Sequence, residues 1–158
     1  MKTLFLISCI LICGLALAQS PARLYVYSQQ FTPGMIPDRN MNGQGSPTRN
    51  STKYYVYFTQ AKFAKIQFDF IRLDSQWYRI NAIDSMGTPI YLKQPEKKLL
   101  MPQTNGMVLQ LNIGEICPAP KGVSDLRKTG AHLIFKQKGK KYNLSLSKIK
   151  GLPQVQGL

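Results

Sequence analysis

The chain has 158 residues, with 21 Lys and Arg against 7 Asp and Glu, so its formal net charge at pH 7 is +14. One His, three Cys and only scattered acids give no ligand cluster with zinc or calcium spacing. So large an excess of positive charge bears on partners and solubility rather than on fold, and it favours an anionic partner.

The first 18 residues have the three parts of a secretory signal peptide. Lys2 supplies a positive start, Leu4 to Leu15 is an almost unbroken apolar run, and Ala16-Leu17-Ala18 has the small-residue pattern that precedes cleavage. We expect residues 1–18 to be removed, which leaves Gln19 at the new N-terminus. This places the protein in the periplasm or outside the cell.

Two other interpretations of this leader fit less well. A transmembrane anchor needs about 20 apolar residues, and the apolar run here is shorter. A lipoprotein needs its modified cysteine just past the run, whereas Cys9 and Cys13 lie inside it. Both cysteines should therefore leave with the leader.

The mature chain would be a single domain that is held together by packing. Cleavage leaves 140 residues, with 20 basic and 7 acidic side chains and a net charge of +13. Cys117 is then the one remaining cysteine, so no internal disulfide can form. Its neighbours are Ile116 and Pro118, and we interpret it as a small buried hydrophobe.

The mature chain begins with a short expected strand over 23–27, in which Leu24 and Val26 share a face. Residues 29–52 come next, and they are rich in Pro, Gly, Asn, Gln, Ser and Thr. A structureless connection of that length is uncommon inside a compact domain. We therefore interpret 19–52 as an N-terminal strand with a long flexible loop, which would leave that strand weakly tethered.

The body of the domain is predicted over 53–150, beginning with a strand over 53–58. Residues 66–73 and 76–83 flank Asp74-Ser75, a pair that favours a two-residue turn, so they predict a hairpin. Both of its faces are largely apolar, and we expect it to be central and covered on both sides. Strict alternation would give one face Ile66, Phe68, Phe70 and Arg72.

Three shorter strands are expected next, over 88–93, 97–101 and 107–113, with Pro and Asn-Gly between them. In the third of these strands the alternating apolar side chains predict one inward face. Residues 118–128 are irregular, with one helical turn expected at 124–128.

The last hairpin has the clearest pattern in the chain. Residues 131–136 and 142–147 both alternate apolar with polar side chains. The two-residue loop between them is either Lys138-Gly139 or Gly139-Lys140, because Gly provides the positive φ that tight hairpins need. Residues 151–158 are expected to be a frayed tail.

About eight short strands separated by turn residues predict an all-β fold. We expect a single antiparallel β-sandwich, for which an immunoglobulin-like arrangement is one candidate. A small closed β-barrel is the alternative. The pattern along the chain does not specify the order of the strands.

The candidate catalytic groups have simpler structural interpretations. His132 has no acidic neighbour in sequence to orient it, and nothing brings it to Cys117 for a thiol dyad. Among the carboxylates, Asp69 suits an ion pair, Asp74 a turn and Asp84 a strand end, rather than a glycosidase pair. We therefore expect no enzymatic activity, no metal and no cofactor.

Basic and aromatic side chains lie together in two places, and these are the candidate binding residues. Aromatic faces stack on sugars or bases, while Lys and Arg neutralise phosphate or carboxylate. The alternative is that the aromatics are ordinary strand residues and the lysines a solvated surface that discourages edge pairing. The candidates are Arg72, Trp77, Tyr78, Arg79, Lys136, Lys138, Lys140 and Lys141.

These features favour an exported, non-enzymatic protein of the cell envelope or extracellular space. It would contact an anionic partner, namely an acidic glycan, lipopolysaccharide or lipid headgroups, through a basic surface; export argues against nucleic acid. One alternative is an accessory or structural subunit of a secreted assembly, joined to a protein partner by strand addition. A second alternative is a hydrolase with an unrecognised site.

Overall fold

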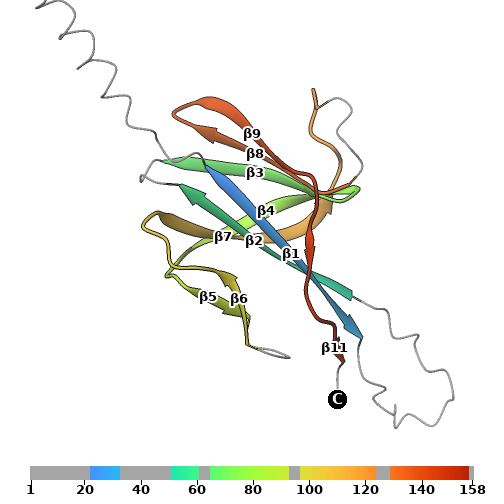
Figure 1. The fold of residues 1–158 in the computed structure, drawn as a ribbon. Helices are drawn as coiled ribbons and strands as arrows, with labels where there is room; N and C mark the ends of the chain where they lie inside the picture. The colour runs from blue at the N-terminus through green and yellow to red at the C-terminus, as the bar shows by residue number, and fades with distance from the viewer. Residues whose placement is uncertain (1–21, 33–50, 61–64, 93–96, 124–128, 157–158) are drawn as a thin grey trace, which may run out of the picture.

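The computed structural model describes residues 22–32, 51–60, 65–92, 97–123 and 129–156. These residues form strands joined by turns and contain no helix, so the predicted all-β class is confirmed (Figure 1). None of them forms a helix long and apolar enough to cross a membrane. The strands are β1 (Arg23–Thr32), β2 (Ser51–Gln60), β3 (Ile66–Leu73), β4 (Gln76–Met86), β5 (Ile90–Leu92), β6 (Lys98–Met101), β7 (Met107–Cys117), β8 (Ala131–Gln137), β9 (Lys140–Leu146), β10 (Lys150–Gly151) and β11 (Val155–Gln156).

One curled sheet makes up most of the molecule, in the strand order β10-β1-β2-β7-β4-β3-β8-β9, and β11 also pairs with β1. Its pairs are antiparallel except that β10 and β11 run parallel to β1. The curl brings β9 back toward β1, which gives the sheet the shape of a half-barrel (Figure 1). β5 and β6 form a separate two-stranded sheet.

The inside of the curled sheet holds the larger core. Phe58 from β2 is fully buried, and its ring lies 5.0 Å from the ring of Phe68 and 5.3 Å from that of Phe135. Strands that are distant in the sequence thus meet at one aromatic cluster. The buried members of this core are Leu24, Val26, Val56, Phe58, Phe68, Ile71, Leu73, Leu111, Ala131, Leu133 and Phe135.

A second, smaller core lies between the outside of β1, β2 and β7 and the β5–β6 sheet. The Tyr27 hydroxyl donates a hydrogen bond to the carbonyl oxygen of Leu100, so a strand of the large sheet is joined to one of the small sheet. The buried members are Tyr27, Tyr57, Ile90, Leu92, Leu100, Met101 and Val108. β1 and β2 are therefore covered on both faces, and alternate residues enter different cores.

The expectation of a weakly tethered first strand is wrong. β1 continues to Thr32 and pairs with β2 from Arg23↔Thr59 to Phe31↔Ser51. On its other side it pairs with β10 and β11, and the Leu152 amide donates to the Ser28 carbonyl at 2.8 Å. The expected fraying of the tail is therefore also wrong as far as residue 156, because these residues extend the sheet.

The Asp74-Ser75 hairpin has the predicted two-residue loop, with Leu73 opposite Gln76. The predicted shared face is wrong, because a bulge lies between Phe68 and Phe70. This extra residue shifts the alternation, so that Phe68 and Ile71 both face the larger core.

The expectation that both strands of this hairpin are covered on both faces is wrong for β4. β3 lies between β4 and β8, but the second half of β4 pairs with β7 alone. Residues 81–85 are exposed, and 43% of the Ile83 side chain is accessible to solvent. The apolar residues of β4 are therefore not buried along the whole strand.

The last hairpin closes through Lys138-Gly139, because Gln137 pairs with Lys140. Both loop residues have positive φ, 50° and 77°, as a type I′ turn requires. Ala131, Leu133 and Phe135 face the larger core, as their alternation predicts.

The connection that precedes this hairpin ends at a backbone hydrogen bond, in which the Asp74 amide donates to the Gly130 carbonyl at 2.7 Å. The helical turn expected at 124–128 and most of the long loop (33–50) lie outside the described residues.

Candidate functional site

Exposed basic side chains gather at one end of the curled sheet. Antiparallel pairing brings the starts of β1, β3, β7 and β9 to the same end as the ends of β2, β4 and β8, and the β8–β9 hairpin projects there (Figure 1). We refer to this region as the basic end. Its exposed cationic residues are Arg23, Lys65, Lys136, Lys138, Lys140 and Lys141.

The hairpin places two of these lysines directly opposite each other, with Lys136 on β8 paired to Lys141 on β9. Like charges in this position repel and destabilise a sheet. Asp69 partly offsets this, since its carboxylate forms an ion pair with Lys136 at 3.1 Å. Of the other described acids, Asp74 and Glu115 lie toward the opposite end of the sheet, while the exposed Asp84 lies near the end of β4 and accepts a hydrogen bond from the Asn112 amide at 2.6 Å. Positive charge at the basic end is therefore only partly balanced.

A row of paired side chains crosses the outside of the sheet at the end opposite the basic end. The cross-strand pairs Cys117↔Trp77, Trp77↔Arg72, Arg72↔His132 and His132↔Ser145 place these five residues side by side on one face. Trp77, Arg72 and His132 are all buried, with Arg72 only 8% exposed. These three side chains therefore pack within the outer face of the sheet and are not freely accessible to a ligand.

The sole histidine of the chain is held firmly within this row. Its Nδ1 atom and the Ser145 hydroxyl lie 2.8 Å apart, and its ring meets that of Trp77 edge-on at 6.1 Å. Burial lowers the pKa of His132 below 6.5, and the positive charges of Arg72 and Lys141 lower it further. The imidazole is thus stabilised in its neutral form.

We expect a proton NMR titration of His132 to give a midpoint below 6.5, and Lys141→Gln to raise that midpoint because one repelling charge is removed. Since the folded pKa is depressed, the unfolded chain binds the proton first as the pH falls below 6.5. Acidification through this window should therefore lower the free energy of unfolding. Lys121→Gln, at an exposed lysine that is not among the charges acting on His132, should leave the midpoint in place; a midpoint at or above 6.5 would contradict the assignment.

The structure divides the predicted binding residues along the sheet. Lys136 and Lys141 are exposed at the basic end, whereas Arg72 and Trp77 share the same outer face but are buried toward the opposite end, with the exposed Arg79 between them. Lys138 lies in the loop and Lys140 directly after it.

Tyr78 is on the opposite, inner face of the sheet, with its ring 6.2 Å from that of Tyr54. The Tyr54 hydroxyl donates to Asp74 at 3.4 Å. Burial raises the pKa of Tyr54 to about 12, helped by Asp74 and Tyr78. These tyrosines therefore belong to the interior at the opposite end from the lysines.

Two basic residues outside the predicted binding set complete the basic end. Arg23 begins β1 and Lys65 directly precedes β3, so both lie far in sequence from the lysine-rich hairpin. No local pattern marks Arg23, whereas Lys65 belongs to a run of interleaved basic and aromatic residues with Lys62 and Phe63. Only the pairing of β1 with β2 and of β3 with β8 reveals that they share an end with the hairpin.

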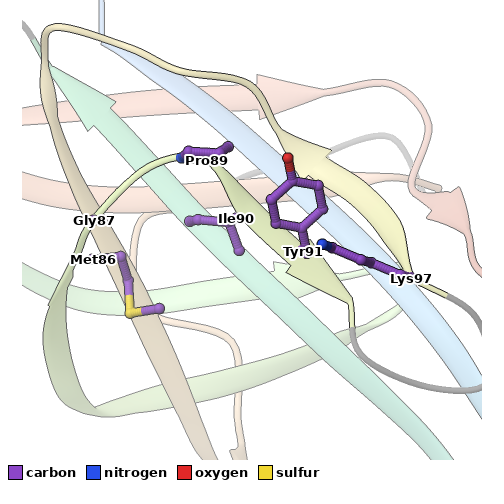
Figure 2. A pocket seen from close by; sticks show the side chains of 6 residues that line it. All are labelled: Met86, Gly87, Pro89, Ile90, Tyr91 and Lys97. Carbon is purple, nitrogen blue, oxygen red and sulfur yellow. The ribbon is translucent and has the colours of Figure 1, made fainter.

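Two pockets lie elsewhere on the molecule. One, of about 430 Å³, has the Lys97 ammonium in its wall, 4.7 Å from the centre of the Tyr91 ring (Figure 2). The other, of about 560 Å³, lies between β2 and β7. Among the described residues, neither lining includes a His, Cys, Asp or Glu, and no group of three or more such side chains is arranged to hold a metal.

The chemistry available at the basic end is non-covalent. A lysine ammonium is a compact charge with three hydrogen-bond donors, and it suits phosphate or carboxylate oxygens. Six such cationic side chains from three segments can neutralise several negative charges at once. No protein-family model matches this chain, and neither a curated protein nor a solved structure matches it significantly.

Proposed function

We propose that this is an exported, non-enzymatic β-protein that attaches to a polyanionic partner through its basic end. The observation that supports the proposal most is the gathering of six exposed cationic side chains at one end of the sheet, of which Lys136 forms an ion pair with Asp69. Export rests on residues 1–18, which lie outside the described residues and stay a prediction.

The Lys136–Lys141 pair gives the proposal an energetic reason. Two like charges held opposite each other repel, and a bound anion that bridges them would relieve the repulsion. Acidic glycans, lipopolysaccharide and anionic headgroups all present closely spaced phosphates or carboxylates. The common feature is a dense array of negative charge on a surface, which the projecting hairpin can reach.

Binding of residues 19–158 to three probes tests the proposal and distinguishes the sources of charge. The probes are heparin, purified lipopolysaccharide, and vesicles of phosphatidylcholine with phosphatidylglycerol. We expect binding to at least one of them at low ionic strength and a steep loss as salt rises, because exposed charges are screened within about 8 Å at physiological ionic strength. Failure to bind any of the three probes at low salt would overturn the proposal.

The triple variant Lys138→Gln, Lys140→Gln and Lys141→Gln should bind its polyanion about 100-fold more weakly. Each lysine near an anionic surface contributes about 1 kcal/mol, and about 1.4 kcal/mol corresponds to a tenfold change in affinity. The three positions are exposed, so folding should be preserved, which a melting curve can verify.

The matched control removes the same charge elsewhere, by Lys97→Gln, Lys98→Gln and Lys121→Gln. These three lysines are also exposed but lie outside the basic end. We expect the control to weaken binding by no more than a few fold, through the overall charge alone. If both triple variants lost affinity equally, net charge rather than the basic end would be responsible.

A further inference from the structure

The sheet is split between β2 and β7 at the end opposite the basic end. These two strands pair only through Tyr57–Gln60 of β2 and Met107–Gln110 of β7. Beyond that segment, β2 continues alongside β1 while β7 continues alongside β4, and the two strands diverge (Figure 1). Within the described residues, 51–56 and 111–117 thus form facing edges with no strand between them. We refer to this gap as the β2–β7 split.

A pocket of about 560 Å³ occupies the split. Its lining includes residues 51–54 of β2 and residues 111–114 of β7, four consecutive residues on each side, together with Phe31. Successive side chains of a strand point to opposite faces. A pocket on one face would therefore be lined by alternate residues, whereas this one is walled by the strand edges and their backbone groups.

We propose that the β2–β7 split accepts an extended, acidic peptide segment of a partner protein as an additional strand. Open strand edges present backbone N–H and C=O groups that pair readily with another extended chain. Among the described residues that line the pocket, Lys53 is the charged one, and it is exposed, while Glu115 lies farther along the β7 edge. A carboxylate on the partner would therefore be matched there, and the strongly basic chain as a whole attracts acidic segments.

The inner side of the β2–β7 split is apolar, and this determines which side chains the partner strand should present there. Leu111 and Ile113 border the larger core, and the Tyr54 ring packs against the same core. Farther along the free edge of β7, Ile116 pairs with the inward-facing Tyr78, yet 63% of its side chain is exposed. Apolar side chains at alternate positions of a partner strand would cover this surface. The part of β2 that pairs with β1 but not with β7 spans six residues, or about 20 Å of extended chain.

This inference is independent of the proposed polyanion binding, because it concerns the other end of the sheet. The first test is amide hydrogen exchange of residues 19–158 followed by NMR. We expect alternate amides of 51–56 and 111–117 to exchange much faster than those of 57–60, which are paired on both sides. Full protection at low protein concentration would show that the chain itself fills the split, and protection that appears only at high concentration would show that a second copy does. Either result would overturn the proposal.

The second test uses phage-displayed random 12-residue peptides selected on the immobilised mature chain. We expect enriched peptides that alternate apolar residues and contain an acid, and a synthetic copy should protect the amides of both edges from exchange. Lys53→Glu should weaken its binding about tenfold, because an attraction becomes a repulsion, while Lys98→Glu should change it less than twofold. No enrichment, or protection of the β9 edge instead, would refute the proposal.

Discussion

Phe58→Ala is expected to lower the free energy of unfolding by about 3–5 kcal/mol, the range for truncating a buried phenylalanine. The side chain is fully buried, and its ring contacts Phe68 and Phe135 at centroid distances of 5.0 and 5.3 Å. Removing it would leave a cavity where β2, β3 and β8 meet inside the curled sheet. Because small domains are stable by only about 5–15 kcal/mol, this one change should take a large part of the total.

Urea denaturation followed by tryptophan fluorescence would measure this loss, since Trp77 is buried in the folded chain. The control is Tyr142→Ala, whose ring stacks on Phe135 at 5.5 Å but is 43% exposed. Little burial is lost there, so we expect a change below about 1.5 kcal/mol. Equal losses for the two variants would contradict the placement of Phe58 at the centre of the core.

Gly130→Ala should also destabilise the fold strongly, with a loss of at least about 2 kcal/mol. Gly130 has a φ of +88°, which side chains with a Cβ rarely adopt. A Cβ there would also lie 2.1 Å from the carbonyl oxygen of Leu146 and 2.8 Å from that of Ser147. Both obstacles are backbone atoms at the end of β9, so a side-chain rotation cannot relieve the clash.

Comparison with Gly122→Ala separates the cost of backbone strain at positive φ from the cost of the steric clash. Gly122 also has a positive φ, +78°, but nothing lies within 4 Å of its would-be Cβ. We expect it to cost about 1 kcal/mol from backbone strain alone. Thermal or urea unfolding of both variants gives the comparison, and a Gly130→Ala loss no larger than that of Gly122→Ala would show that the contact with Leu146 and Ser147 is absent.

Local patterns in the sequence were sufficient for the fold class and for the two tight hairpins. Alternation over 131–136 and 142–147 correctly assigned the inward residues of the last hairpin, and the Gly139 position required a turn that tolerates positive φ. The same reasoning failed along β3, because a bulge between Phe68 and Phe70 inserts one residue and reverses the faces of the residues after it. A bulge leaves no local mark in a strand whose two faces are both apolar.

The candidate site was predictable only where its residues are neighbours in the chain. The four lysines of the last hairpin lie within six positions, so their clustering is visible in the sequence. The buried state of Arg72 and Trp77, and the position of Tyr78 on the inner face, depend on which strands flank them. The arrival of Arg23 at the same end results from its pairing with Thr59 of β2.

The sequence by itself determined that the chain is all-β and strongly basic, because composition, alternation and turn chemistry act over a few neighbouring residues. Tertiary structure decided the strand order, the pairing of the C-terminal residues with β1, the basic end and the β2–β7 split. Each of these features depends on which strands, far apart in the sequence, pair along their edges. That pairing is determined by the burial of apolar side chains from many segments in the two cores, and not by any single segment.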